Sequence, residues 1–382
     1  MKNHKYILLC GDNYNALGIC RSLGEKGLNP IVVLYTRNPY LLNHSIYVND
    51  LYQVNSAEEG LDFIISQWGN EPEKPFIYTM DDYAAMLLDQ HYNQLINHFY
   101  FFHGDKQGAI SYYLNKKNIC DLAEKCGIQQ PKGEVLKRGE LPKSLCYPVI
   151  TKVITSTKGA WKKDVFVCQN VEELKEAYKL ITADELLVQE YIEKKNELCI
   201  DGISLNGGKD IILSFTSEYL RMSKESFGHY MRMKHYENED VCEKIRKVIK
   251  GSHYTGIFDF ECLIDINDKL WFLEVNYRNS MWSYAHTFGG MNLPYYWAKW
   301  TLEGKINNDE VSLRKEPFTA MGEIADFVYV AHDHHTSLWT WYKQFRACDC
   351  TYIYNRKDPK PFYHAIWNKA MMTFCHKILK QK

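Results

Sequence analysis

The first third of the chain alternates short apolar runs with segments of helical periodicity. Residues 6–10 (YILLC) predict a buried strand, followed by a turn and a helix that stops at Gly27. PIVVLY (30–35) predicts a second strand, and PFIYTMDD (75–82) predicts another that runs into an acidic turn and a helix. This order predicts a Rossmann-like α/β domain over residues 1–110. The first turn lacks the G-x-G-x-x-G pattern, so no nicotinamide or flavin site is expected there.

The middle of the chain predicts a helix followed by a series of strands. Residues 112–128 have a helical period that ends at Gly127 and Pro131. With helices predicted between them at 171–182 and 239–251, the expected strands are YPVITKV (147–153), VFVC (165–168), ELLVQEYI (185–192), ELCIDGISL (197–205), DIILSFTSEYL (210–220), GIFDFECLI (256–264) and LWFLEVNYR (270–278). The last two strands predict a hairpin joined by DINDK. The domain prediction is residues 111–304, with a lid subdomain at about 135–190.

Residues 305–382 contain few glycines and many aromatic and basic residues, and they predict a helical extension. Its final segment, PFYHAIWNKAMMTFCHKILK, predicts an amphipathic helix packed on the body of the protein. Peripheral contact with a membrane through its Lys, Trp and Phe residues is the alternative. The HDHH run at 332–335 is interpreted as a polar turn before a helix over SLWTWY, with zinc binding as the less favoured alternative.

Composition limits the function classes. A chain of 382 residues, with 46% hydrophobic and 24% charged residues, predicts a globular protein of two or three domains. The formal net charge of −1 argues against wholesale binding to nucleic acid. We expect no signal peptide, because the first apolar run is too short, and no segment approaches the roughly 18 apolar residues of a membrane span. Scattered cysteines without a CxxC pair favour reduced thiols and a cytoplasmic location.

Polar residues interrupt the last predicted hairpin in a pattern that suggests a metal site. Glu274, Asn276 and Arg278 alternate and therefore share one face of their strand. Asp259 and Glu261 share one face of the preceding strand, so either can meet Glu274 and Asn276 across the ladder. Oxygen ligands without a nearby His favour Mg²⁺, with Mn²⁺ as an alternative, and Mg²⁺ commonly bridges phosphate oxygens. A solvated sheet face is the competing interpretation.

Upstream residues could hold the phosphates and the nucleoside. Lys152 ends a strand and Lys116 begins a helix, and either ammonium group can contact phosphate oxygens. Glu190 and Glu197 could bracket an adenosine. A lone lysine on a strand end is usually just solvated, and each of these residues is ambiguous by itself. Their order along the chain is more specific.

In this order the sequence resembles the ATP-grasp superfamily over roughly residues 5–300. The resemblance implies an α/β (α+β) fold with a Rossmann-like first domain, a lid subdomain and a central antiparallel sheet. The motifs that carry it are KKNICDLAEKCGIQQP, YPVITK followed by a loop glycine, QEYI, FDF and FLEVNYR. The ATP-contacting residues that they imply are Lys116 (with Lys117 as the adjacent alternative), Lys152, Gly159, Glu190, Ile192 and Glu197. The Mg²⁺ ligands that they imply are Asp259, Glu274 and Asn276.

The resemblance places Arg278 facing an anion and gives Lys152 and Arg278 catalytic roles. Two positions depart from the family pattern. Tyr277 stands where the family usually has proline, which is a departure in the acceptor pocket, and the loop of the lid has fewer glycines than in many members. His229 and Arg232 are candidate contacts to triphosphate or substrate; the alternative is that their segment is an exposed connector.

EVNYRNS, GGMNLPYYWAKW and DPKPF look most like carboxylate–amine ligases related to bacterial D-aspartate ligase. The implied function is ATP-dependent amide formation through an acyl phosphate, with small-molecule carboxylate and amine substrates such as an amino acid or peptide. A carboxylase or carbamoyl-phosphate type of ATP-grasp reaction, or a nucleotide-binding module without turnover, remains an alternative. The sequence leaves the oligomeric state open, with a homodimer as one option.

Overall fold

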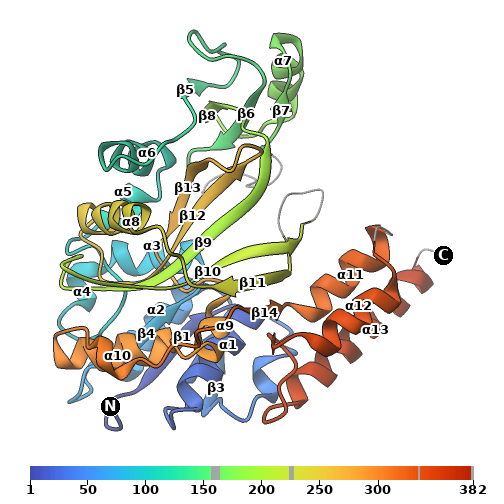
Figure 1. Ribbon diagram of the computed structural model, residues 1–382. Helices are drawn as coiled ribbons and strands as arrows, with labels where there is room; N and C mark the ends of the chain where they lie inside the picture. Colours follow the sequence, from blue (N-terminus) through green and yellow to red (C-terminus); the bar gives the residue numbers. More distant parts are fainter. Residues whose placement is uncertain (156–163, 223–227, 334–335, 380–382) are drawn as a thin grey trace.

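The computed structural model describes residues 1–155, 164–222, 228–333 and 336–379 (Figure 1). Its first sheet has four parallel strands in the order β3-β2-β1-β4. The elements of this region are β1 (Tyr6–Cys10), α1 (Tyr14–Gly24), β2 (Ile31–Leu34), η1 (Leu42–His44), β3 (Asp50–Gln53), α2 (Ala57–Trp68), β4 (Phe76–Thr79), α3 (Asp82–Gln90) and α4 (Tyr92–Leu95). The β–α–β opening predicted from the sequence is confirmed. The first helix ends at Gly24 rather than at Gly27, which has a φ of +73° in the turn that follows.

A second, smaller unit stands above the rest of the molecule in Figure 1. Its sheet has the order β5-β8-β6-β7, with every neighbouring pair antiparallel. It is reached through two helices, and its elements are α5 (Ala109–Tyr113), α6 (Lys116–Lys125), β5 (Gly133–Lys137), β6 (Val149–Val153), β7 (Val167–Cys168), α7 (Val171–Leu180) and β8 (Glu185–Glu190). Leu136, Val149, Leu174 and Val188 belong to a core of its own. The exact domain boundaries stay a prediction.

The central sheet has seven strands in the order β13-β12-β9-β10-β11-β14-β15. Neighbours are antiparallel except for the parallel pair β14 and β15. The strands and helices of this region are β9 (Lys194–Leu205), β10 (Asp210–Arg221), β11 (Tyr230–Lys234), α8 (Glu239–Gly251), β12 (Gly256–Asp265), β13 (Leu270–Asn276), α9 (Ser283–Phe288), α10 (Leu293–Glu303), η2 (Asn308–Glu310), β14 (Phe318–Met321), α11 (Glu323–Asp333), α12 (Leu338–Ala347), β15 (Cys350–Thr351) and α13 (Lys360–Leu379). The predicted hairpin of β12 and β13 is confirmed.

Helix α10 packs between the first sheet and the central sheet. Its Trp297 is buried, and the indole makes edge-on contacts with Phe76, Tyr78 and Phe102 at ring-centroid distances of 5.3, 5.0 and 4.6 Å. The Tyr78 hydroxyl donates to the Pro294 carbonyl oxygen at 2.8 Å. These contacts hold the end of β4 against the central sheet, and the side chains considered below meet at that junction.

The last part of the chain contains two short strands in addition to the helices that the sequence predicted. Strands β14 and β15 extend the central sheet beyond β11. The segment before α13 is tied to α1 by Arg21, whose Nε lies 3.0 Å from the Asp358 carboxylate, with both side chains fully buried. The same guanidinium donates to the carbonyl oxygens of Tyr352 and Ile353, each at 2.8 Å.

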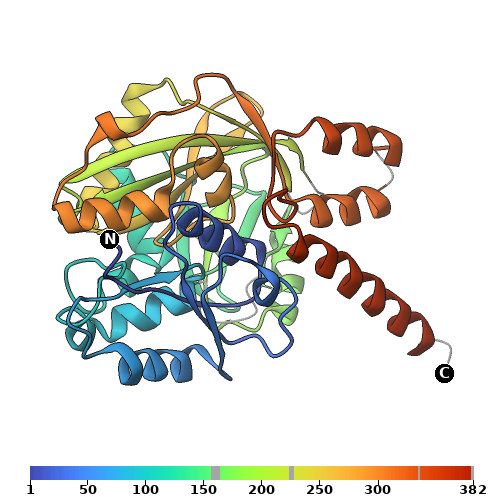
Figure 2. The ribbon, with the colours of Figure 1, turned by 90° about the horizontal axis from the view of Figure 1, so that it is seen from below.

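Helix α13 leads away from the body, as Figure 2 shows. Pro361 and Ala365 are buried, whereas 67% of Trp367 is exposed. The predicted helix is therefore confirmed, and its first turns pack on the body. The predicted amphipathic pattern is wrong, because the apolar residues of α13 occur on all sides of the helix rather than along one face. Among the described residues, no helix combines the length and the apolarity needed to cross a bilayer.

Candidate active site

The β12–β13 hairpin brings four polar residues onto one face of the central sheet. Asp259 lies opposite Asn276, and Glu261 lies opposite Glu274. The Asn276 Nδ2 atom donates to Glu261 Oε1 at 2.7 Å and to Asp259 Oδ2 at 3.2 Å. On the other side of β12, Asp201 of β9 lies opposite Asp259. The predicted meeting of polar side chains across this ladder is confirmed, because antiparallel partners place their side chains on the same face.

The two predicted lysines approach this row from the smaller unit. Lys116, the first residue of α6, places its Nζ 2.8 Å from Glu274 Oε2. Its backbone N–H donates to the Ile154 carbonyl oxygen at 2.8 Å, which joins the start of α6 to the end of β6 and brings Lys152 into the same region. Burial acts to lower the pKa of Lys116, but the charge of Glu274 raises it overall.

Lys152 is in a different electrostatic position. Its burial, followed by the positive charge of Lys116, lowers the pKa of Lys152 to about 8. The ammonium groups of Lys116 and Lys152 repel each other. Glu274 pairs with Lys116, so the positive charge of Lys152 is left in surplus. An anion of several charges, such as a polyphosphate, would relieve that repulsion.

The carboxylates have the opposite imbalance. Burial and the negative charges of Asp259, Glu274 and Glu197 raise the pKa of Glu261 well above its ordinary value. Burial and Asp201 likewise raise the pKa of Asp259, whose Oδ1 is buried without a hydrogen-bond partner. Lys116 lowers the pKa of Glu274. A buried cluster of acids that resists ionisation, with one unpartnered oxygen, fits a divalent cation.

One group of potential metal-binding side chains is found among the described residues. It comprises Glu197, Cys199 and Glu261, with ligand atoms that all lie within 4.8 Å of one another. The two carboxylates suit a hard cation, whereas the thiol does not. Glu197 also accepts from Lys194 Nζ at 2.5 Å. The structure thus places Glu197 beside the acidic cluster, and its role toward a ribose stays a prediction.

Arg278 joins the acidic row to the first sheet. Its Nε donates to Asp82 Oδ1 at 2.9 Å, and one terminal nitrogen donates to Asn276 Oδ1 at 3.0 Å. Asp82 begins α3 directly after β4, so the contact joins two sheets far apart in sequence. Burial acts to lower the pKa of Arg278, but Asp82, Asp259 and the neighbouring glutamates raise it overall. Because Asn276 Oδ1 accepts from Arg278, the amide would have to turn or share this oxygen to bind a metal.

The adenosine-side predictions are only partly visible. Glu190 ends β8, and its Oε1 accepts from the Cys146 backbone N–H at 3.3 Å, while Ile192 lies in the short link to β9. This link joins the smaller unit to the central sheet, as expected for a hinge. Gly159 lies outside the described residues. The nucleotide roles of all three residues stay predictions.

Two histidine-containing segments lie away from the acidic row. Strands β9 and β10 separate β11, with Arg232 and the preceding His229, from β12. Their contact with phosphates stays a prediction. The polar turn predicted for residues 332–335 is wrong at His332, which is in the last turn of α11, and its Nδ1 bonds to the Val328 carbonyl oxygen at 2.7 Å. The helix predicted after it is α12; His334 and His335 lie outside the described residues.

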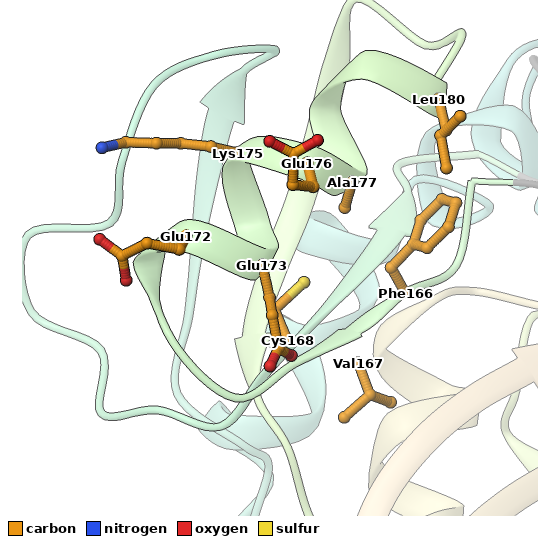
Figure 3. A pocket seen from close by; sticks show the side chains of 9 residues that line it. All are labelled: Phe166, Val167, Cys168, Glu172, Glu173, Lys175, Glu176, Ala177 and Leu180. Carbon is orange, nitrogen blue, oxygen red and sulfur yellow. The ribbon is translucent and has the colours of Figure 1, made fainter.

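A separate pocket of about 430 Å³ lies in the smaller unit between β7 and α7 (Figure 3). Phe166, Val167 and Leu180 line one part of it, and Glu172, Glu173 and Glu176 lie along the helix. It contains none of the site residues predicted from the sequence. Its acidic rim also argues against a phosphate ligand there.

The structure adds to the site two residues outside the ligand set that the resemblance implied. Glu261, rather than Asp259, lies directly opposite Glu274, so the register favours Glu261 as the carboxylate partner. The alternating pattern of β12 named both candidates, but register depends on pairing. Asp82 was visible only as part of an acidic turn, and no local pattern connects it with Arg278.

Comparisons with known proteins agree with this architecture. No family model matches the chain. A stretch of 132 residues is 25% identical to N5-carboxyaminoimidazole ribonucleotide synthase of Staphylococcus aureus, covering 35% of this chain and 34% of the relative. The match thus spans about a third of the curated relative's length.

Solved structures resemble the chain over most of its length. A crystal structure of N5-carboxyaminoimidazole synthetase from Staphylococcus aureus superposes with a TM-score of 0.64 at 16% identity, covering 87% of this chain and 86% of that one. An L-amino acid ligase from Bacillus licheniformis gives 0.64 at 16% identity, covering 84% and 80%, and a biotin carboxylase from Campylobacter jejuni gives 0.65 at 18%, covering 82% and 74%. The chain has the ATP-grasp fold, as the sequence resemblance predicted.

Proposed function

We propose that this ATP-grasp chain is an ADP-forming ligase that activates a small carboxylic acid with ATP and joins it to an amine. The observation that carries the proposal is the pairing of two opposed charge clusters. Lys116 and Lys152 come from one unit, and Glu261, Glu274 and Asn276 come from the central sheet. Lysines and a carboxylate-bound Mg²⁺ together suit the phosphates of a nucleotide.

The lysines bind and orient the phosphates. In the structure Lys116 Nζ lies 2.8 Å from Glu274 Oε2. The charges of both residues act on the pKa of Lys152. Phosphate oxygens would raise the pKa of Lys152 and keep it charged through the transfer. Glu261 and Glu274, with Asn276 if its amide turns, would hold the cation. When bound, Mg²⁺ supplies charge neutralisation at the transferred phosphoryl group.

The reaction has two steps. A carboxylate oxygen of the acid attacks the γ-phosphorus, the bond to the bridging oxygen breaks, and ADP leaves. The amine nitrogen then attacks the acyl carbon, loses a proton, and inorganic phosphate departs as the amide forms. Arg278 would bind the acid or stabilise the oxyanion. Its hydrogen bonds to Asp82 and Asn276, which hold the guanidinium at the end of the row, support this role.

The names of the structural neighbours support two substrate classes. The L-amino acid ligase supports an amino acid as acid or amine, in line with the sequence resemblance to carboxylate–amine ligases. The carboxyaminoimidazole synthetase and biotin carboxylase favour a second candidate, in which bicarbonate is the acid and a carbamate is formed. One neighbour is described as a dimer, which supports a homodimer as the oligomeric state.

A screen of ADP release tests the proposal. The purified chain would be incubated with MgATP, carboxylate donors that include D-aspartate, and amino acid or peptide acceptors, and product masses would be recorded. ADP release that requires both partners, with a product mass equal to their sum less water, is expected. Release that requires bicarbonate instead would favour carboxylation. Nucleotide binding without substrate-stimulated release would contradict both and favour a module without turnover.

The variant that tests the site is Glu274→Ala, which removes the partner of Lys116 and one candidate cation ligand. We expect it to lose Mg²⁺-dependent nucleotide binding, measured by calorimetry. A matched control is Glu218→Ala, which removes a carboxylate of the same sheet that pairs with Lys234. Equal loss in both variants would indicate a general fault of the sheet rather than a nucleotide site.

A further inference from the structure

The helices at the C-terminal end expose an unusual number of large apolar side chains. Trp339 is 64% exposed, Tyr363 is 62% exposed and Trp367 is 67% exposed. The α12–α13 surface is defined by these and their exposed apolar neighbours on the same two helices, which together are Leu338, Trp339, Tyr342, Tyr363, Ile366, Trp367 and Met371. Figures 1 and 2 show both helices standing out at one side of the molecule. A concentration of exposed aromatic residues marks an interaction surface.

The exposed residues of α13 form a stripe. Tyr363, Ile366, Trp367 and Met371 recur at helical spacing, whereas buried Pro361 and Ala365 lie on the opposite side, which meets the body. The stripe is therefore not the core-facing side of the helix. None of the described residues covers it, so it stays in water unless a partner covers it.

The charges of the two helices have one sign. Helix α12, and α13 up to Met371, contain Lys343, Arg346, Lys360 and Lys369 and no Asp or Glu. The whole chain, in contrast, has 46 basic and 47 acidic residues. A surface this biased within a balanced chain calls for an anionic partner.

Two acids of the neighbouring helix α11 are occupied elsewhere. Glu323 of α11 is buried and accepts from the backbone N–H groups of Tyr352 and Tyr354. Asp326 is buried and pairs with Arg221 at 3.1 Å. Neither carboxylate is placed to neutralise the basic residues of the α12–α13 surface.

An apolar groove opens beside this surface. It has a volume of about 860 Å³ and lies between α11, α12 and α13. Its lining includes Phe327, Val328, Phe345, Phe362 and Ile366. The groove extends the apolar area inward from the exposed aromatic residues, so it can receive an apolar group that reaches past them.

We propose that the α12–α13 surface docks on an anionic phospholipid bilayer. Trp and Tyr favour the membrane–water interface, where an amphipathic ring meets both hydrocarbon and headgroups. Lys and Arg beside them attract anionic headgroups, and the lack of carboxylates avoids repulsion. A partner protein with a matching acidic and apolar face would need side chains complementary to seven exposed apolar positions, whereas a lipid surface adapts to them.

Vesicle co-sedimentation of the full chain tests the proposal. The chain should bind vesicles that contain phosphatidylglycerol, bind vesicles of phosphatidylcholine alone far less, and dissociate as salt increases. Lys343→Gln with Arg346→Gln should weaken partitioning by roughly 30-fold, since each basic residue near such a surface contributes about fivefold. Trp339→Ser with Trp367→Ser should reduce binding further, because the aromatic anchors are lost.

Matched controls lie elsewhere on the surface. Lys195→Gln with Arg138→Gln removes two exposed basic residues, and Tyr112→Ser removes an aromatic residue that is 57% exposed on α5. These controls should bind like the parent chain. Circular dichroism and melting curves would show that all variants fold, as expected for substitutions of exposed side chains.

Three results would overturn the proposal. The first is no binding to either kind of vesicle. The second is equal binding of the parent chain and the charge variant. The third is a dimer in solution, by light scattering, that Trp339→Ser with Trp367→Ser converts to monomer, since a second copy of the chain would then cover the surface.

Discussion

The substitution Glu261→Gln tests whether Glu261 belongs to a metal site or is an ordinary buried acid. Glutamine keeps the shape of the side chain and the oxygen that accepts from Asn276 Nδ2 at 2.7 Å. It removes the negative charge of the carboxylate, which the charges of Asp259, Glu274 and Glu197 repel. The variant therefore tests electrostatics with little change in packing.

The sign of the effect without metal follows from proton linkage. The folded-state pKa of Glu261 is raised, so the fold keeps a proton that the unfolded chain has lost. The stability associated with this proton is fully present below the unfolded pKa of about 4.3 and is lost as pH rises, at up to about 1.4 kcal/mol per pH unit. By pH 7 the loss is at most about 4 kcal/mol, a limit reached only where the carboxyl stays protonated up to that pH. Metal-free Glu261→Gln should be more stable than the parent chain by up to that amount at pH 7, and equal to it near pH 4.

The order should reverse when cation and nucleotide are present. A ligand at about 100 times its Kd stabilises the parent fold by about 2.7 kcal/mol. The variant should gain much less, because a carboxylate that would hold the cation is missing. Thermal midpoints over a pH series, with and without Mg²⁺ and a non-hydrolysable ATP analogue, measure both effects. Glu218→Gln, on the same sheet, should show neither. A lower metal-free midpoint at pH 7, or an undiminished shift with Mg²⁺ and nucleotide, would refute the reasoning.

Three further predictions concern other parts of the chain. Arg278→Ala should abolish product formation and leave nucleotide binding largely intact, because Asp82 and Asn276 hold the guanidinium at the end of the acidic row; unchanged turnover would contradict this. Binding of ATP at pH 8 should take up about half a proton through Lys152, because its pKa is about 8 and should rise beside phosphate. Calorimetry in buffers of different ionisation enthalpy measures this uptake, which should be absent in Lys152→Arg. Arg21→Met should destabilise the chain by about 3–5 kcal/mol in chemical denaturation, because it leaves the Asp358 carboxylate buried without its ion-pair partner, and adding Asp358→Asn should recover part of the loss.

Most elements were predictable because they have a local pattern. The alternation along β12 and β13 named Asp259, Glu261, Glu274 and Asn276 as residues of shared faces, and the structure pairs them across one ladder. Lys116 was predicted from its place at the start of a helix. Its contact with Glu274 was not predicted, because 158 positions separate the two residues and no local pattern connects them.

The misses come from segments without a local pattern. Strands β14 and β15 have four and two residues, too few for periodicity to show, and they exist because β11 offers an edge. The outward course of α13 was missed for a related reason. Its composition predicts a helix, but only the surrounding surface determines how much of that helix is covered.

The sequence by itself determined the order of elements, the alternation of polar residues on the hairpin and the types of side chain available for phosphate and metal. Tertiary structure decided which of these meet. It set Glu261 opposite Glu274 by strand register, and it brought Asp82 to Arg278 by packing the first sheet against the central one through α10. The physical reason is the range of each effect. Periodicity and turn preference act over a few residues, whereas register, burial and pKa depend on neighbours that only the folded chain brings together.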